Sequence, residues 1–171
     1  MRSRSTFKFI ALVVATYAVG LLIYDLWILP KTSFDESLIH LLVSCSEPVL
    51  QWLGYVLLPH QSDWHNTIHI QGSNGVWISS NCDGFALIWV FSAVLFYLPG
   101  GWKRKGVYMV LGSLVIEVFN VLRIISLAII EHHFPQSLAF NHDYTFTVLV
   151  YSAVVALWYL WLRKFQFVGK Q

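Results

Sequence analysis

The chain has 171 residues, of which 57% are apolar and only 12% are charged, and its mean hydropathy is +0.61. This composition is typical of an integral membrane protein and excludes an ordinary soluble domain, and the length allows one membrane domain over residues 1–171. A formal net charge of +2 is small for a nucleic-acid-binding protein. We therefore expect membrane lipid around the chain and no nucleic-acid partner.

The first apolar run follows a basic N-terminus. Arg2, Arg4 and Lys8 precede an apolar stretch that continues to Leu29 and ends at Pro30. The stretch is long enough to cross a bilayer, and the positive-inside rule places its N-terminus in the cytoplasm. It lacks a small-residue cleavage site, so we interpret it as a retained helix and not as a signal peptide.

Three further crossings are expected, and basic residues orient them. They cover Phe85–Leu98, Gly106–Ile130 and Thr145–Leu162. Lys103-Arg104-Lys105 separates the first two, and Arg163-Lys164 follows the last, so both basic clusters belong in the cytoplasm. The sequence thus predicts an all-α polytopic protein of the cytoplasmic membrane, with about four transmembrane helices and both termini cytoplasmic.

A further apolar stretch, Leu38–Leu58, does not fit as a crossing. The chain leaves the membrane on the outer side at Pro30 and must still be outside at Cys82, and the polar segment after Pro59 is unable to cross back. Polar side chains recur along this stretch at steps of four, three and four residues, which places them on one helix face: His40, Ser44, Glu47 and Gln51. We expect an amphipathic outer-face segment that is either interfacial or re-entrant.

Two short alternating runs, Thr67–Gln71 and Val76–Ser79, flank Gly72-Ser73-Asn74-Gly75. The Asn-Gly pair is a strong signal for a tight turn between two strands. A short β-hairpin is therefore expected on the outer face, and it delivers the chain to Cys82.

Cys82 lies where a polar run meets the apolar helix that begins at Phe85. Asn81 or Cys82 is expected near the helix N-cap, where N–H groups and the positive end of the helix dipole favour thiolate. A lone cysteine is more often a small buried hydrophobic residue. The boundary position between Asn81 and Gly84 nevertheless favours a reactive thiol. A disulfide to the other cysteine, Cys45, is the alternative.

Arg123 lies deep in an otherwise apolar span, where an arginine is costly and therefore a candidate functional residue. It lies about 25 Å along the helix from Gly106, which is level with Cys82 on the outer side. Asn120 lies one turn below and is expected to orient the guanidinium. The structural alternative is that Arg123 snorkels to outer headgroups or pairs with Glu117.

His142 precedes the last span and is therefore also placed on the outer side. A thiol nucleophile needs a base near neutral pH, which a histidine supplies. His132 and His133 are rival candidates for this role. A metal site on His65 and His69 lacks a carboxylate or cysteine to complete its ligand set, so we expect no metal and no cofactor.

Together these motifs resemble the exosortase/archaeosortase family of membrane-embedded cysteine transpeptidases. The resemblance covers about Ile68 to Tyr151. It rests on Asn81-Cys82-Asp83-Gly84 before a span, Asn120-x-x-Arg123-Ile124 within a span, and His142 before the final span. Many members have Cys-Ser-Gly at the first motif, so Asp83 is a departure, and its charge would act on the thiolate by like-charge repulsion.

The resemblance implies a protein-sorting peptidase or transpeptidase with its active site on the extracytoplasmic side. Its substrates would be secreted proteins with a C-terminal motif, a transmembrane helix and a basic tail. His142 would take the proton of Cys82, whose thiolate would attack the scissile carbonyl, and Arg123 would stabilise the oxyanion. Asn81, Gly84 and Asn120 are expected to support this site.

Two other functions stay open on the residues alone. A non-catalytic membrane assembly factor would pair Arg123 with a carboxylate of another subunit, and a membrane thiol oxidoreductase would use Cys45 and Cys82. A native disulfide would indicate the oxidoreductase, a single labile thiol of low pKa the sorting enzyme, and an inert thiol the assembly factor.

Overall fold

The structure is a computed structural model, and it describes residues 2–59 and 66–168. Its principal helices are α1 (Arg2–Ile23), α3 (Phe34–Trp52), α4 (Phe85–Tyr97), α5 (Trp102–His133) and α7 (Phe146–Val168). Shorter turns connect them: η1 (Tyr24–Ile28), α2 (Leu29–Lys31), η2 (Ser80–Cys82), η3 (Pro135–Ser137), α6 (Leu138–Phe140) and η4 (Asn141–Thr145).

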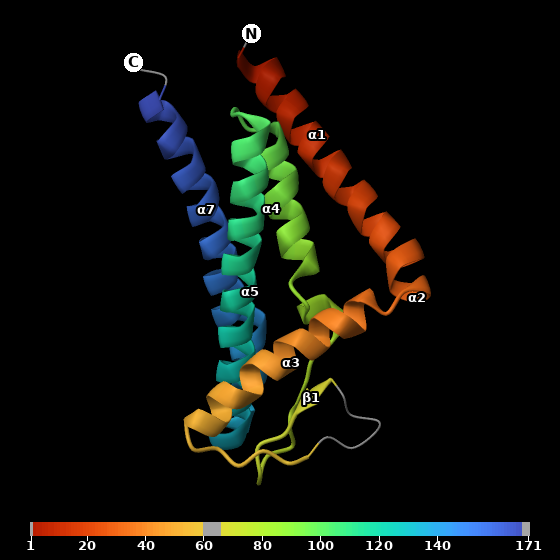
Figure 1. Cartoon of the computed structure of the whole chain (residues 1–171), viewed down its shortest axis with the longest axis vertical. Coiled ribbons are helices and arrows are strands. Elements are labelled where there is room, and N and C mark those ends of the chain that lie inside the picture. Colours follow the sequence, from red (N-terminus) through yellow and green to blue (C-terminus); the bar gives the residue numbers. More distant parts are fainter. Residues whose placement is uncertain (1, 60–65, 169–171) are drawn as a thin grey trace.

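Helices α1, α4, α5 and α7 form the bundle, with both chain ends and the α4–α5 turn at the same end (Figure 1). Three segments are long and apolar enough to cross a membrane: Thr6–Lys31, Trp102–His133 and Pro135–Lys164. The fourth expected crossing, α4, is a shorter apolar helix of 13 residues. These elements confirm the predicted all-α membrane fold.

Helix α3 lies obliquely across the end of the bundle opposite the termini (Figure 1). Ile39, Leu42, Val43 and Leu50 on its inner face are buried against α5 and the hairpin, while the predicted polar face is turned outward. The chain makes no reversal within α3. Of the two alternatives for Leu38–Leu58, this continuous helix favours the interfacial one.

The predicted hairpin is present beneath α3. Strands β1 (Thr67–Ile68) and β2 (Val76–Trp77) pair antiparallel, with Ile68 opposite Val76. Gly72 and Gly75 in the connection have φ angles of +89° and +81°, which glycine adopts without strain.

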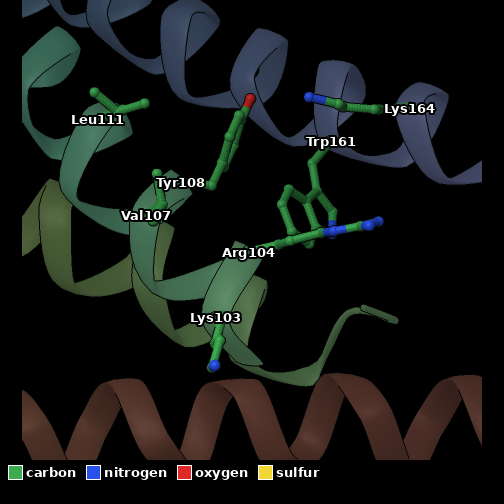
Figure 2. A pocket seen from close by; sticks show the side chains of 7 residues that line it. All are labelled: Lys103, Arg104, Val107, Tyr108, Leu111, Trp161 and Lys164. Atoms are coloured by element: carbon green, nitrogen blue, oxygen red, sulfur yellow. The ribbon is translucent and has the colours of Figure 1, made fainter. Parts of the chain in front are cut away.

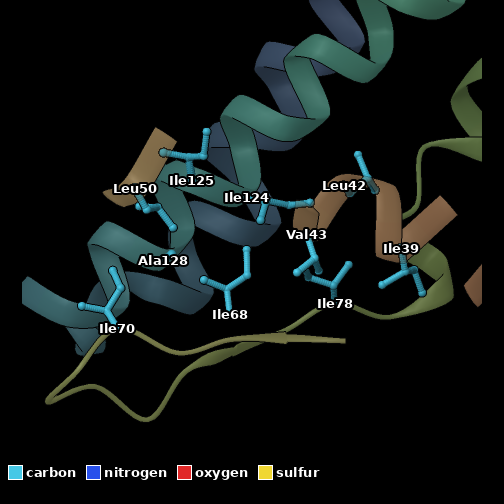
Figure 3. Close-up of a cluster of buried hydrophobic side chains, with 10 residues drawn as sticks. All are labelled: Ile39, Leu42, Val43, Leu50, Ile68, Ile70, Ile78, Ile124, Ile125 and Ala128. Carbon is cyan, nitrogen blue, oxygen red and sulfur yellow. The ribbon is translucent and has the colours of Figure 1, made fainter. Parts of the chain in front are cut away.

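Two clusters of buried hydrophobic side chains hold the bundle, α3 and the hairpin together. In the first, isoleucines of the hairpin pack between α3 and the outer part of α5 (Figure 3). In the second, side chains of α4, α5 and α7 interlock within the bundle: Phe91, Leu95, Ile116, Val154 and Trp161. The loop that carries Cys82 runs from the first core into the second, so both cores fix its position.

Candidate active site

Cys82 is held by the 3₁₀ turn η2, immediately before α4. Its backbone N–H donates to the Ser79 carbonyl at 2.8 Å, and its own carbonyl accepts from Asn120 Nδ2 at 3.0 Å. Asn120 is fully buried, so it ties the cysteine loop firmly to α5. We expected Asn120 to orient the guanidinium of Arg123, whereas its observed hydrogen bond holds the backbone of Cys82.

Gly84 is the N-cap of α4 and has a φ angle of +86°. A Cβ at this position would lie 2.7 Å from Glu117 Oε1 and 3.0 Å from Asn120 Nδ2. A side chain here would therefore strain the backbone and separate the cysteine loop from α5. Cys82 lies two residues before this N-cap, as expected, and the side chain of Asn81 lies outside the described residues.

Asp83 uses its carboxyl group to cap α4 and to reach the α1–α3 junction. Its Oδ1 accepts from the Phe85 N–H at 2.9 Å, and its Oδ2 lies 2.9 Å from Tyr24 Oη, which is also 2.7 Å from Asp35 Oδ1. A phenol carries one proton, so the second of these two contacts requires a proton on a carboxyl group. Burial raises the pKa of Asp83 to about 6, which is consistent with that shared proton.

Three segments that are distant in sequence meet at the thiol. Arg123 Nη2 lies 3.0 Å from Cys82 Sγ and 3.1 Å from His142 Nε2, and the sulfur and Nε2 are 3.5 Å apart. These side chains come from η2, α5 and η4. Glu117 Oε1 has no hydrogen-bond partner among the described residues, so the expected alternative of a Glu117–Arg123 pair is not what the structure has.

The contacts of His142 define its tautomer. Nδ1 lies 2.8 Å from Asp143 Oδ1, and a carboxylate accepts, so Nδ1 carries the proton. The guanidinium of Arg123 only donates, so Nε2 must accept. In its neutral state His142 therefore presents an unprotonated nitrogen to the thiol. In its protonated state Nε2–H donates to the thiolate, which is the hydrogen bond that lowers the pKa of Cys82. Asp143 was missed as a site residue in the sequence, where its adjacency to His142 was the only signal.

The surroundings of the thiol act on its pKa in opposite directions. Burial raises the pKa of Cys82, but the hydrogen bond with His142 and the charge of Arg123 lower it by more. The Ser79 hydroxyl, a second residue that sequence reasoning missed, adds a weaker lowering effect from 3.6 Å. The pKa of the thiol consequently lies below its ordinary value, which increases the thiolate fraction near neutral pH.

A comparison with protein families was decisive. The family model described as "Transmembrane exosortase (Exosortase_EpsH)" matches residues 4–166, nearly the whole chain. The chain belongs to the transmembrane exosortase family. No curated protein and no solved structure gives a significant match. The matched range contains Cys82, Arg123 and His142, and family membership confirms the resemblance seen in the sequence.

In this exosortase the rival histidines lie elsewhere. His132 and His133 end α5, where both rings pack edge-on against Tyr55, and His133 Nε2 lies 3.0 Å from Tyr55 Oη. Neither has a hydrogen bond to Cys82 within residues 2–59 and 66–168. The structure thus brings His142 to the thiol.

The structure also shows where Cys45 and His69 lie. Cys45 is exposed on the outer side of α3 and both cysteines are free, so the disulfide alternative is not what the structure has. His65 lies outside the described residues, and His69 Nε2 lies 2.7 Å from the Asn74 carbonyl. Within the described ranges, no group of three metal-ligating side chains is present.

Proposed function

We propose that this exosortase is a cysteine-dependent sorting peptidase or transpeptidase. Its substrates are secreted proteins that end in a recognition motif, a transmembrane helix and a basic tail. One arrangement carries the proposal: Arg123 Nη2 is 3.0 Å from Cys82 Sγ and 3.1 Å from His142 Nε2. Nucleophile, base and cation therefore converge, which is what acyl transfer through a thioester requires.

The reaction begins with a proton transfer. His142 Nε2 takes the thiol proton of Cys82, while Asp143 accepts from Nδ1–H and stabilises the imidazolium. The thiolate attacks the scissile carbonyl carbon and forms a tetrahedral intermediate. When that intermediate collapses, the imidazolium returns its proton to the leaving amine, and a thioester remains on Cys82.

Arg123 changes partners during this sequence. Before the proton transfer, its Nη2 donates to the unprotonated Nε2 of His142. Once Nε2 carries a proton, it no longer accepts, so that N–H of Arg123 is released toward the sulfur and the developing oxyanion. The stabilising charge is thereby presented as negative charge appears on the substrate. An amine or water then attacks the thioester and frees Cys82.

A groove on α7 offers a docking site for the transmembrane helix of the substrate. It has a volume of about 570 Å³ and is lined by Val148, Tyr151, Ser152, Val155, Ala156 and Tyr159. Ser152 and Ala156 are small and one turn apart, which permits close approach of a second helix in a membrane. The groove begins just beyond η4, so a helix docked there leads toward His142.

Charge placement supports the orientation that this function needs. Most of the described basic residues lie at the bundle end with the termini (Figure 1): Lys8, Lys103, Arg104, Lys105, Arg163 and Lys164. Lys31 and Arg123 lie toward the other end. The positive-inside rule assigns the end with the termini to the cytoplasm. Cys82 then faces the extracytoplasmic side of the cytoplasmic membrane, where secreted substrates arrive.

Cleavage of a secreted substrate with the tripartite C-terminal signal, in membranes containing each enzyme variant, tests the proposal. Cys82→Ser should abolish processing, because a hydroxyl is far less ionised than a thiol at neutral pH. Cys45→Ser is the matched control and should process normally, since Cys45 is exposed on α3. Full processing by Cys82→Ser would refute the function, and equal loss in both variants would favour the oxidoreductase.

A further inference from the structure

A pocket lies at the opposite end of the bundle from Cys82, between the first turns of α5 and the last turns of α7 (Figure 2). Its volume is about 360 Å³. Residues of two kinds line it: the cationic Lys103, Arg104 and Lys164, and the apolar or aromatic Val107, Tyr108, Leu111 and Trp161. The proposed reaction uses none of these residues.

None of the residues that line the pocket is acidic. Glu117 is the first acidic residue along α5, beyond Leu111. Arg104 extends beside Trp161, with Lys164 across the same opening, whereas the amine of Lys103 points away (Figure 2). Two cations from two helices therefore face one space.

The aromatic wall of the pocket is held in place by the backbone. Trp161 is 3% exposed, and its Nε1–H donates to the Pro99 carbonyl at 3.1 Å. The Tyr108 hydroxyl donates to the Leu157 carbonyl at 2.8 Å. Both rings thus have their polar groups satisfied and present their apolar surfaces to the opening.

The remaining wall is open toward the surroundings of the bundle. Val107 and Leu111 are 62% and 55% exposed and lie one turn apart on α5, next to the cationic rim. An apolar strip that continues from a cationic rim matches a ligand with an anionic head and a hydrocarbon tail. Such pockets between transmembrane helices bind anionic lipid head groups on the cytoplasmic side.

We infer that this pocket binds an anionic phospholipid, with its phosphate between Arg104 and Lys164 and an acyl chain along Val107 and Leu111. Free phosphate would satisfy the cations but leave the apolar strip uncovered. The basic tail of a sorting substrate is repelled by the same cations. The inference does not depend on the proposed reaction, because it concerns the other end of the bundle.

Native mass spectrometry of the full-length protein, released from phosphatidylglycerol or phosphatidylcholine nanodiscs, tests the inference. Phosphatidylglycerol should remain bound preferentially. The Arg104→Gln/Lys164→Gln double variant should bind it on the order of 10-fold more weakly. The matched control is Lys8→Gln/Arg163→Gln, which removes two exposed cations at the same end but outside the pocket, and it should bind as the native protein does.

Two further comparisons distinguish the sources of the anionic group. Glycerophosphoglycerol, which has the head group without acyl chains, and inorganic phosphate should both fail to displace the lipid at equal concentration. Displacement by either would reassign the pocket to a free anion. The lipid site would be overturned if phosphatidylcholine were retained as well as phosphatidylglycerol. It would also be overturned if both double variants lost affinity for phosphatidylglycerol equally.

Discussion

At Arg123 the difference between arginine and lysine is chemically large. A guanidinium stays charged when desolvated and offers several donors in a fixed fork, and here one nitrogen serves both Cys82 and His142. A lysine amine is a point charge that readily loses its proton when buried. We therefore expect Arg123→Lys to accumulate normally but to process substrate on the order of 10²-fold more slowly.

The measurement is cleavage in membranes, normalised to enzyme abundance. Lys103→Arg is a suitable control, because Lys103 is an exposed cation at the far end of the same helix. A fully active Arg123→Lys enzyme would show that the residue merely anchors α5 in the membrane, since a lysine stem reaches the same interface.

The shared proton near Asp83 gives a second prediction at this scale. The folded state raises the pKa of Asp83 from 3.8 to about 6, so it holds the proton more tightly than the unfolded chain does. The contribution of this group to stability therefore falls as pH rises between about pH 4 and pH 6. Asp83→Asn removes this loss, since its amide keeps an acceptor for Phe85 and supplies a donor for Tyr24.

Thermal unfolding of the purified protein at about pH 4 and about pH 7 tests the direction of this pH dependence. Relative to the native protein, Asp83→Asn should gain stability at the higher pH. The control Glu36→Gln removes an exposed carboxylate on the same helix as Asp35. Its stability relative to the native protein should be the same at both pH values. A gain by Asp83→Asn that does not change with pH would contradict the shared proton.

The sequence revealed those site residues whose type conflicts with their surroundings. Cys82 at a helix start and Arg123 in an apolar span are such conflicts, and His142 followed from its place before the last span. Tyr24 and Asp35 carry no such signal, because their role depends on how η1 and α3 meet the cysteine loop. Contacts of that kind arise from tertiary packing, which periodicity and spacing do not encode.

At the scale of elements, the turn η4, which carries His142, leads directly into α7 and the groove proposed for docking. Ala156→Phe should fill the groove and slow processing several-fold without changing alkylation of Cys82, because the ring occupies space that a second helix would need. Val118→Phe places the same ring on an exposed position of α5 outside the groove and should have little effect. Equal rates for both variants would remove the groove as the docking site.

The elements were predictable to the extent that each has a local signature. The Asn-Gly turn identified the hairpin, and the polar stripe identified α3 as a surface helix. The apolar run Phe85–Leu98, closed by Pro99, predicted α4 to within one residue of its observed end at Tyr97. The sequence did not show that the inner face of α3 packs on α5 and the hairpin, because that contact depends on tertiary packing.

For the whole molecule, the clustering of basic residues at the end with the termini predicts the orientation in the membrane. In a Cys45→Ser/Cys82→Ser background, Gln71→Cys in the hairpin connection should react with a membrane-impermeant thiol reagent in intact cells. Lys103→Cys at the opposite end should react only after the cells are opened. The reverse pattern would invert the topology and place Cys82 in the cytoplasm, away from secreted substrates.

The short length of α4 limits the distance between the turn at Pro99 and Cys82. Thirteen residues rise about 20 Å, whereas the hydrocarbon layer is about 30 Å thick. The loop of residues 82–84 and α5 cover the remaining distance: from Trp102 to Arg123, α5 rises about 30 Å and brings the guanidinium to the thiol. Under the proposed function, the scissile bond has to be presented at this level, which a substrate anchored by its own transmembrane helix does directly. Selection would then depend on the vertical position of the scissile bond as well as on its sequence, and the same motif on a freely diffusing peptide should be cut more slowly.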